Sequence, residues 1–191
     1  LAFAQVYLRP DADLGGYRKI IIDPPRVAFQ PGWRKSINST RNVSRWLVPD
    51  DERKIADDLA ADLRLVVADV FQTRGYEIAT APGPGVLRLT PSVTDLYLNA
   101  PDVSSSITTR LFNVDTADAT LVLEARDAVT GSILARVVDR STVHELKRVN
   151  RVSDVSNLFS MDAAFRQWTA NCVKEFKGRA ERVSSSAPTA K

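Results

Sequence analysis

The stretch TLVLEARDAVTGSILARVVDR, residues 120–140, indicates the class of fold. Two runs of alternating apolar side chains flank a turn sequence, DAVTG, at Leu121, Leu123 and Ala125 and at Ile133, Ala135 and Val137. Alternation with a period of two is typical of strands that bury one face, and a short polar turn between two such runs predicts a β-hairpin. We therefore expect an antiparallel pair with one face on the core.

Two further stretches predict amphipathic helices. Residues 50–74 carry apolar side chains three and four positions apart, with Asp50 as the expected N-cap and Gly75 as the stop. Residues 160–177 do the same, from Ser160 as N-cap to a stop at Gly178. The expected buried stripes are Ile55, Leu59, Leu63, Val66 and Val70 in the first helix and Met161, Phe165, Trp168, Cys172 and Phe176 in the second.

The rest of the chain predicts strands and one ordered coil. IIIDPPRVAF at 20–29 is typical of a strand stopped by its proline pair, and further strands are expected over 76–143. Within them the apolar alternation slips by one residue, which predicts a β-bulge near Pro91 to Asp95. Residues 30–48 show neither period, but Trp33 and Trp46 indicate a coil that lies on the body.

Together these elements predict a single α+β domain over residues 1–178. We expect a mixed or antiparallel sheet of about five strands, two amphipathic helices packed on one of its faces, and an irregular N-terminal segment over 1–48. Residues 179–191 lack an apolar period and are expected to form a flexible tail.

Composition and charge exclude several classes of protein. The 191 residues are 44% hydrophobic and 26% charged, which is typical of a folded globular domain and not of a disordered chain or a disulfide scaffold. The net charge is only +3, so the chain lacks the basic footprint of a nucleic-acid-binding protein, and no nucleic acid partner is expected. No apolar run reaches the length of a membrane span.

The sequence contains no set of residues that is typical of an active site. A zinc site needs three or four converging ligands, and the chain has one histidine, His144, and one cysteine, Cys172. The nucleophile elbow, the phosphate-binding loop and the zinc-protease motif are all missing. We therefore expect no catalytic, metal-binding or cofactor-binding residues and no cofactor, and we expect Cys172 to be a buried, unreactive thiol.

Three stretches together resemble a known bacterial family. They are YLRPDADLGGYRKIIIDP at 7–24, GPGVLRLTPSVTDLYLNAPD at 83–102 and the hairpin at 120–140. In this order they are similar to the family called domain of unknown function 3313, whose members look like lipoproteins of Gram-negative envelopes. The resemblance implies a periplasmic protein that is lipid-anchored to the outer membrane through a cysteine upstream of Leu1. That anchor is the membrane contact we expect.

The expected function is non-enzymatic binding of a protein or another envelope component, which remains unidentified. Two alternatives stay open. A carrier of a small lipophilic ligand would need an apolar cavity of several hundred Å³, and a hydrolase would need a deep pocket with two or more carboxyl groups of raised pKa.

A candidate interaction surface follows from the distribution of charge. Residues 1–48 hold eight basic and three acidic side chains, whereas residues 50–74 hold four basic and seven acidic ones. One prediction is that the basic coil lies along a stripe of aspartates on the first helix, held by buried Trp33 and Trp46; the other is that the coil is free to meet anionic lipid head groups. The candidate residues are Arg34, Arg41 and Arg45 in the coil and Asp58, Asp62 and Asp69 on the helix.

Overall fold

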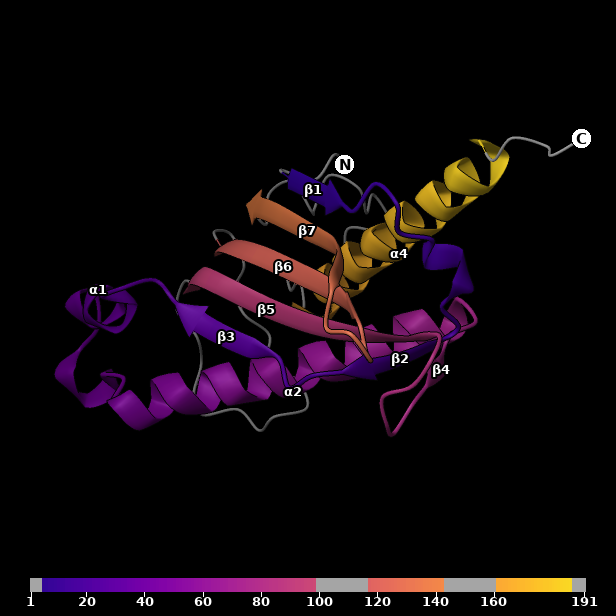
Figure 1. Cartoon of the computed structure of the whole chain (residues 1–191). Coiled ribbons are helices and arrows are strands. Elements are labelled where there is room, and N and C mark those ends of the chain that lie inside the picture. Colours follow the sequence, from indigo (N-terminus) through magenta and orange to yellow (C-terminus); the bar gives the residue numbers. More distant parts are fainter. Residues whose placement is uncertain (1–4, 99–116, 143–160, 187–191) are drawn as a thin grey trace, which may run out of the picture.

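The computed structural model describes residues 5–98, 117–142 and 161–186, which form an α+β fold with a mixed sheet (Figure 1). The fold class agrees with the sequence prediction, but the sheet has seven strands and not about five. The strands are β1 (Gln5–Leu8), β2 (Lys19–Ile22), β3 (Arg26–Phe29), β4 (Glu77–Ile78), β5 (Val86–Leu98), β6 (Ala117–Asp127) and β7 (Ile133–Thr142).

The predicted hairpin is confirmed as β6 and β7, which pair antiparallel with Leu123 opposite Val137. Its turn is closed by the Asp127 carboxylate, which accepts hydrogen bonds from the backbone N–H groups of Val129 and Thr130 at 3.0 and 2.7 Å. β5 pairs antiparallel with β6, and β1 adds an antiparallel edge strand to β7. The hairpin therefore lies in the middle of the sheet.

The N-terminal segment contributes three strands, where the sequence predicted one. β2 and β3 lie one after the other along the same side of β5, and both run parallel to it. Pro24 and Pro25 interrupt the strand, as predicted, because proline lacks the N–H group that a ladder needs. The chain resumes its pairing at Arg26, so the prolines divide one edge into two strands. β4 pairs with β2 in parallel.

The predicted β-bulge lies in β5. Thr94 is opposite Thr120 and Tyr97 is opposite Asp118, so β5 has one residue more than β6 in this interval. Asp95 adopts a positive φ of 52°, which bends the strand at this point. The buried side chains before and after it, Val93 and Leu96, consequently face the same side of the sheet.

The first predicted helix is α2 (Pro49–Thr73), and its predicted apolar stripe is buried. The prediction that Asp50 caps it is wrong. The N-cap is Val48, because Pro49 takes the first helical position and the Asp51 carboxylate accepts the Val48 N–H at 2.8 Å. Gly75, with φ of 90°, follows the helix and allows the left-handed turn into β4.

The second predicted helix is α4 (Met161–Ser186), and its aromatic stripe with Cys172 is buried. The predicted stop at Gly178 is wrong, because α4 continues to Ser186, so the expected flexible tail over 179–191 begins with helical residues. A single glycine costs a helix only about 1 kcal/mol, and Arg179, Ala180 and Glu181 are good helix formers. The expected N-cap Ser160 and the end of the tail, 187–191, lie outside the described residues.

Both long helices cover the same face of the sheet, as the alternation of β6 predicted (Figure 1). They are joined at two places: the Arg166 guanidinium of α4 pairs with the Asp69 carboxylate of α2, and Lys177 donates to the Arg74 carbonyl at 2.7 Å. In the described part of the chain, no helix is both long and apolar enough to span a membrane.

Candidate interaction surface

The segment between β3 and α2 extends past the C-terminal ends of strands β3 and β5 (Figure 1). It contains the short helix α1 (Trp33–Ser39) and the single 3-10 turn η2 (Val43–Arg45). The sequence predicted an ordered coil here and missed α1. A helix of seven residues is too short to show an amphipathic period in the sequence.

Trp33 attaches this segment to the body. Its side chain is 1% exposed and stacks on Phe29 of β3, with ring centroids 3.9 Å apart and planes 15° from parallel. Its indole N–H donates to the Leu98 carbonyl, at the end of β5, at 3.0 Å. Ile37 and Leu47 are buried in the same core. The segment is therefore docked, as the first of the two charge-based predictions requires.

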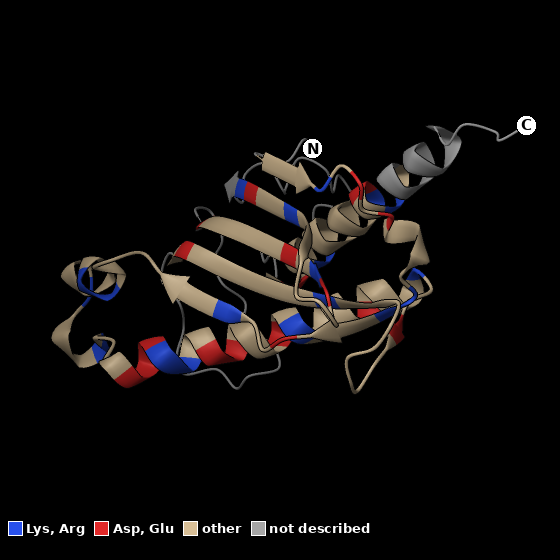
Figure 2. Ribbon diagram, viewed as in Figure 1, with Lys and Arg blue, Asp and Glu red and all other residues tan. Residues whose placement is uncertain are grey.

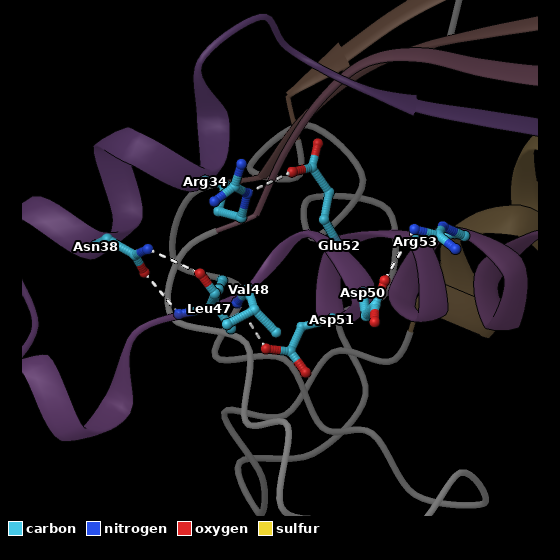
Figure 3. A network of polar contacts seen from close by, with 8 residues as sticks. All are labelled: Arg34, Asn38, Leu47, Val48, Asp50, Asp51, Glu52 and Arg53. Carbon is cyan, nitrogen blue, oxygen red and sulfur yellow. Dashed lines mark hydrogen bonds and ion pairs between the residues drawn. The ribbon is translucent and has the colours of Figure 1, made fainter.

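Asn38 closes the loop that carries η2. Its amide nitrogen donates to the Leu47 carbonyl at 2.9 Å, and its amide oxygen accepts the Leu47 N–H at 2.8 Å (Figure 3). The side chain thus pairs with the Leu47 backbone as a neighbouring strand would. Because both ends of the loop are fixed, residues 39–46 form a constrained projection.

The acidic side chains at the start of α2 are each held by a partner within this region (Figure 3). Asp51 accepts the Val48 N–H, and Asp50 pairs with Arg53 at 2.8 Å. Glu52 pairs with Arg34 of α1 at 3.1 Å, which joins α1 to the first turn of α2. These carboxylates also lie at the positive end of the helix dipole.

The loop between α1 and α2 carries five side chains that we call the exposed tip: Arg41, Val43, Arg45, Trp46 and Val48. All are exposed except Arg41, which is half-buried. Val43 is 72% exposed, Trp46 is 52% exposed and Val48 is 53% exposed. The prediction that Trp46 is buried like Trp33 is therefore wrong. Its ring is nevertheless held in place, because its N–H donates to the Arg41 carbonyl at 3.3 Å. The Arg41 guanidinium in turn donates to the Arg45 carbonyl at 3.4 Å.

The exposed tip belongs to a stretch of the chain whose charged residues are all basic. No acidic residue occurs from residue 24 to residue 49, and Lys35 adds a further exposed cation on α1. Figure 2 shows this contrast, with blue residues on the segment around α1 and alternating red and blue residues along α2. The tip therefore combines apolar and cationic side chains without a carboxylate of its own.

Two of the six candidate residues form ion pairs with residues outside the set. Arg34 pairs with Glu52 at the start of α2, and Asp69 pairs with Arg166 of α4. Arg41 and Arg45 belong to the exposed tip. The two remaining aspartates lie on α2, half-buried at Asp58 and exposed at Asp62.

The chemically reactive groups of the described residues lie elsewhere. Burial raises the pKa of the Cys172 thiol well above its ordinary value, and the side chain is fully buried. The pKa of Asp127 is lowered, first by the Thr130 N–H and then by the Tyr17 hydroxyl, which donates at 2.8 Å. Among these residues no three His, Cys, Asp or Glu side chains gather as a metal site requires. His144 lies outside them.

Sequence reasoning missed the exposed part of this surface, although one signal was available. In the run Trp46-Leu47-Val48, an extended chain turns alternate side chains to opposite sides. Buried Leu47 therefore implies exposed neighbours. The helix start could also have been predicted: proline favours the first helical position, so Pro49 indicates Val48 as the N-cap.

Comparison with known proteins identifies the family. The model described as "Protein of unknown function (DUF3313)" matches residues 2–172, so the chain belongs to this family, as the resemblance predicted. No curated protein sequence matches the chain.

Three solved structures are similar to the chain at low identity and low TM-score. The PelC dodecamer from Paraburkholderia phytofirmans is 10% identical, with 90% of this chain and 94% of PelC covered and a TM-score of 0.44. A neuraminyllactose-binding hemagglutinin homolog from Helicobacter pylori is 14% identical, with 91% and 92% covered and a TM-score of 0.38. A DUF330 protein from Xanthomonas campestris is 13% identical, with 94% of each chain covered and a TM-score of 0.38.

Proposed function

We propose that this member of the DUF3313 family is a non-enzymatic binding module of the Gram-negative cell envelope, and that it binds an envelope component through the exposed tip. The observation that carries the proposal is Trp46, which is 52% exposed on a segment fixed by buried Trp33 and by the Asn38 contacts. Tryptophan and arginine are the residues most often found at the centre of binding surfaces. A rigid support also lowers the entropic cost of binding.

The environment of the reactive side chains supports binding over catalysis. A nucleophilic cysteine needs a lowered pKa and access to substrate, whereas Cys172 is buried and its pKa is raised. A carboxylic acid that donates a proton near neutral pH needs a raised pKa, whereas the pKa values of Asp11 and Asp127 are lowered by their hydrogen bonds.

The proposed location is the periplasm, with a lipid anchor in the outer membrane. This part of the proposal rests on the family resemblance. Fractionation of a Gram-negative host that expresses the full-length protein tests it: the protein should follow the outer membrane, and recovery from the cytoplasm would contradict the proposal.

Co-sedimentation of the 191-residue chain with isolated Gram-negative envelopes tests the binding surface. We expect Trp46→Ala to weaken the association at least severalfold, because it removes the largest exposed apolar side chain of the tip. Leu65→Ala is the matched control, since Leu65 is 69% exposed on α2, away from the tip. Equal binding by the two variants, both folded, would contradict the proposed surface.

A further inference from the structure

We infer that the envelope component bound by the exposed tip is an anionic lipid surface, into which Trp46 inserts. This inference rests on the proposed function and specifies its partner. It adds to the membrane contact expected through an upstream anchor, and it takes up the charge-based alternative of contact with anionic lipid head groups, here for a docked segment.

The apolar part of the tip has the composition of an interfacial anchor. Tryptophan prefers the boundary between lipid head groups and acyl chains, where its ring is buried and its polar edge stays wet. Val43, whose carbonyl accepts the Trp46 backbone N–H at 3.2 Å, and Val48, two residues after Trp46, add two exposed β-branched side chains. The indole N–H of Trp46 is already satisfied by the Arg41 carbonyl. Insertion of the ring therefore leaves no unpaired donor in the bilayer.

The charge of the tip suits an anionic surface. The acidic side chains that follow the tip in the sequence, Asp50, Asp51 and Glu52, each have a partner: Arg53, the Val48 N–H and Arg34, respectively. Among the residues that the structure describes, Lys35 and Arg45 form no ion pair, so their charges are available to phosphate groups. Basic side chains near an anionic bilayer each strengthen binding by about fivefold.

The size of the tip favours a lipid surface over a protein partner. Stable protein interfaces use about 20–30 residues from each side and a well-packed apolar centre. The exposed tip offers only three exposed apolar side chains, far fewer residues than such an interface uses. A bilayer requires no shape complementarity, and a small apolar insertion combined with several cations is sufficient for reversible binding.

Tryptophan fluorescence provides a direct test with the 191-residue chain. Of the three tryptophans, Trp33 and Trp168 are buried, so a change in emission on binding reports on Trp46. Vesicles of phosphatidylglycerol and phosphatidylcholine should shift the emission to the blue and sediment with the protein, and 0.5 M salt should reverse both. Vesicles of phosphatidylcholine alone should bind at least tenfold more weakly.

Matched variants separate the tip from the rest of the surface. Arg45→Gln should weaken vesicle binding by about fivefold and Trp46→Ala by about tenfold. The controls Arg64→Gln and Leu65→Ala, at exposed positions of α2, should leave it unchanged. Far-UV circular dichroism and the melting temperature verify that each variant is folded.

Two outcomes would overturn the inference. The first is no sedimentation and no blue shift with phosphatidylglycerol vesicles while envelopes still bind through Trp46; the proposed function then stands and its partner is a protein or glycan. The second is vesicle binding that the tip variants and the α2 variants weaken equally. If envelope binding is also insensitive to Trp46→Ala, the proposed function fails as well.

Discussion

Replacement of Trp33 by alanine should detach the segment that carries the exposed tip. The side chain is 1% exposed, so the mutation removes a complete buried indole and its stacking on Phe29. Substitutions of buried tryptophan by alanine cost about 3–5 kcal/mol. The mutation also leaves the Leu98 carbonyl without its donor, which is why we expect a loss near 4–5 kcal/mol, at the upper end.

Urea unfolding followed by circular dichroism measures this free energy, and two further variants divide it into parts. Trp33→Phe keeps an aromatic ring against Phe29 but loses the hydrogen bond, so we expect a loss of about 1–2 kcal/mol. Trp46→Ala should change the free energy of unfolding by less than about 0.5 kcal/mol, because its side chain is half-exposed.

Hydrogen exchange provides an independent measurement of the same detachment. In the Trp33→Ala variant the amides of α1 and of residue 47 should lose protection, because Trp33 and the Asn38 contacts hold this segment on the sheet. The amides of β6 and β7 should stay protected in native buffer. A loss below about 1 kcal/mol with unchanged protection of α1 would refute the claim that Trp33 docks the segment.

Three further predictions concern the core and the pH dependence. Trp168→Ala should lower the free energy of unfolding, measured in urea, by about 3–5 kcal/mol. Trp168→Phe should stay within about 1 kcal/mol of the wild type, because the buried Trp168 indole N–H that it removes finds no acceptor among the described residues. Cys172 should react with a thiol reagent at neutral pH only when urea unfolds the protein, since burial raises its pKa; rapid labelling of the native protein would contradict this. Burial and the Asp127 acceptor raise the pKa of Tyr17 to about 12. The protonated Tyr17 hydroxyl therefore contributes fully to the free energy of unfolding below pH 10, and this contribution is lost as the pH rises toward 12. Because Tyr17 is partly exposed, we expect a loss of at most about 1 kcal/mol, measured as the difference in pH dependence between wild type and Tyr17→Phe.

The parts of the fold that the sequence predicted are those with a local signal. The hairpin and the apolar stripes of α2 and α4 can each be recognised within one stretch of about 20–25 residues, because the periodicity that indicates them is local. The bulge in β5 was visible for the same reason, since an extra residue changes the alternation within the strand.

The parts that the sequence could not predict depend on distant partners. β1 has only four residues, and its strand pairing places Val6 opposite Val137, 131 residues later in the chain. Asp69 pairs with Arg166, 97 residues away, so its position on α2 gave no indication of its partner. Long-range pairing of this kind follows from topology, which periodicity within a strand or helix does not encode.

The two tryptophans of the α1 segment show why residue type alone does not separate a core position from a surface one. Trp33 is buried, stacked and hydrogen-bonded to the sheet, and the fold accounts for all of these contacts. Trp46 is held by the Arg41 carbonyl with half of its surface in water, and it adds little to the core. Single exposed apolar residues are normal on proteins. Trp46 differs because Val43 and Val48, close to it in the chain, are exposed too, and the carboxylates of Asp51 and Glu52 already have hydrogen-bond or ion-pair partners. That combination on a fixed support is better explained by binding than by folding.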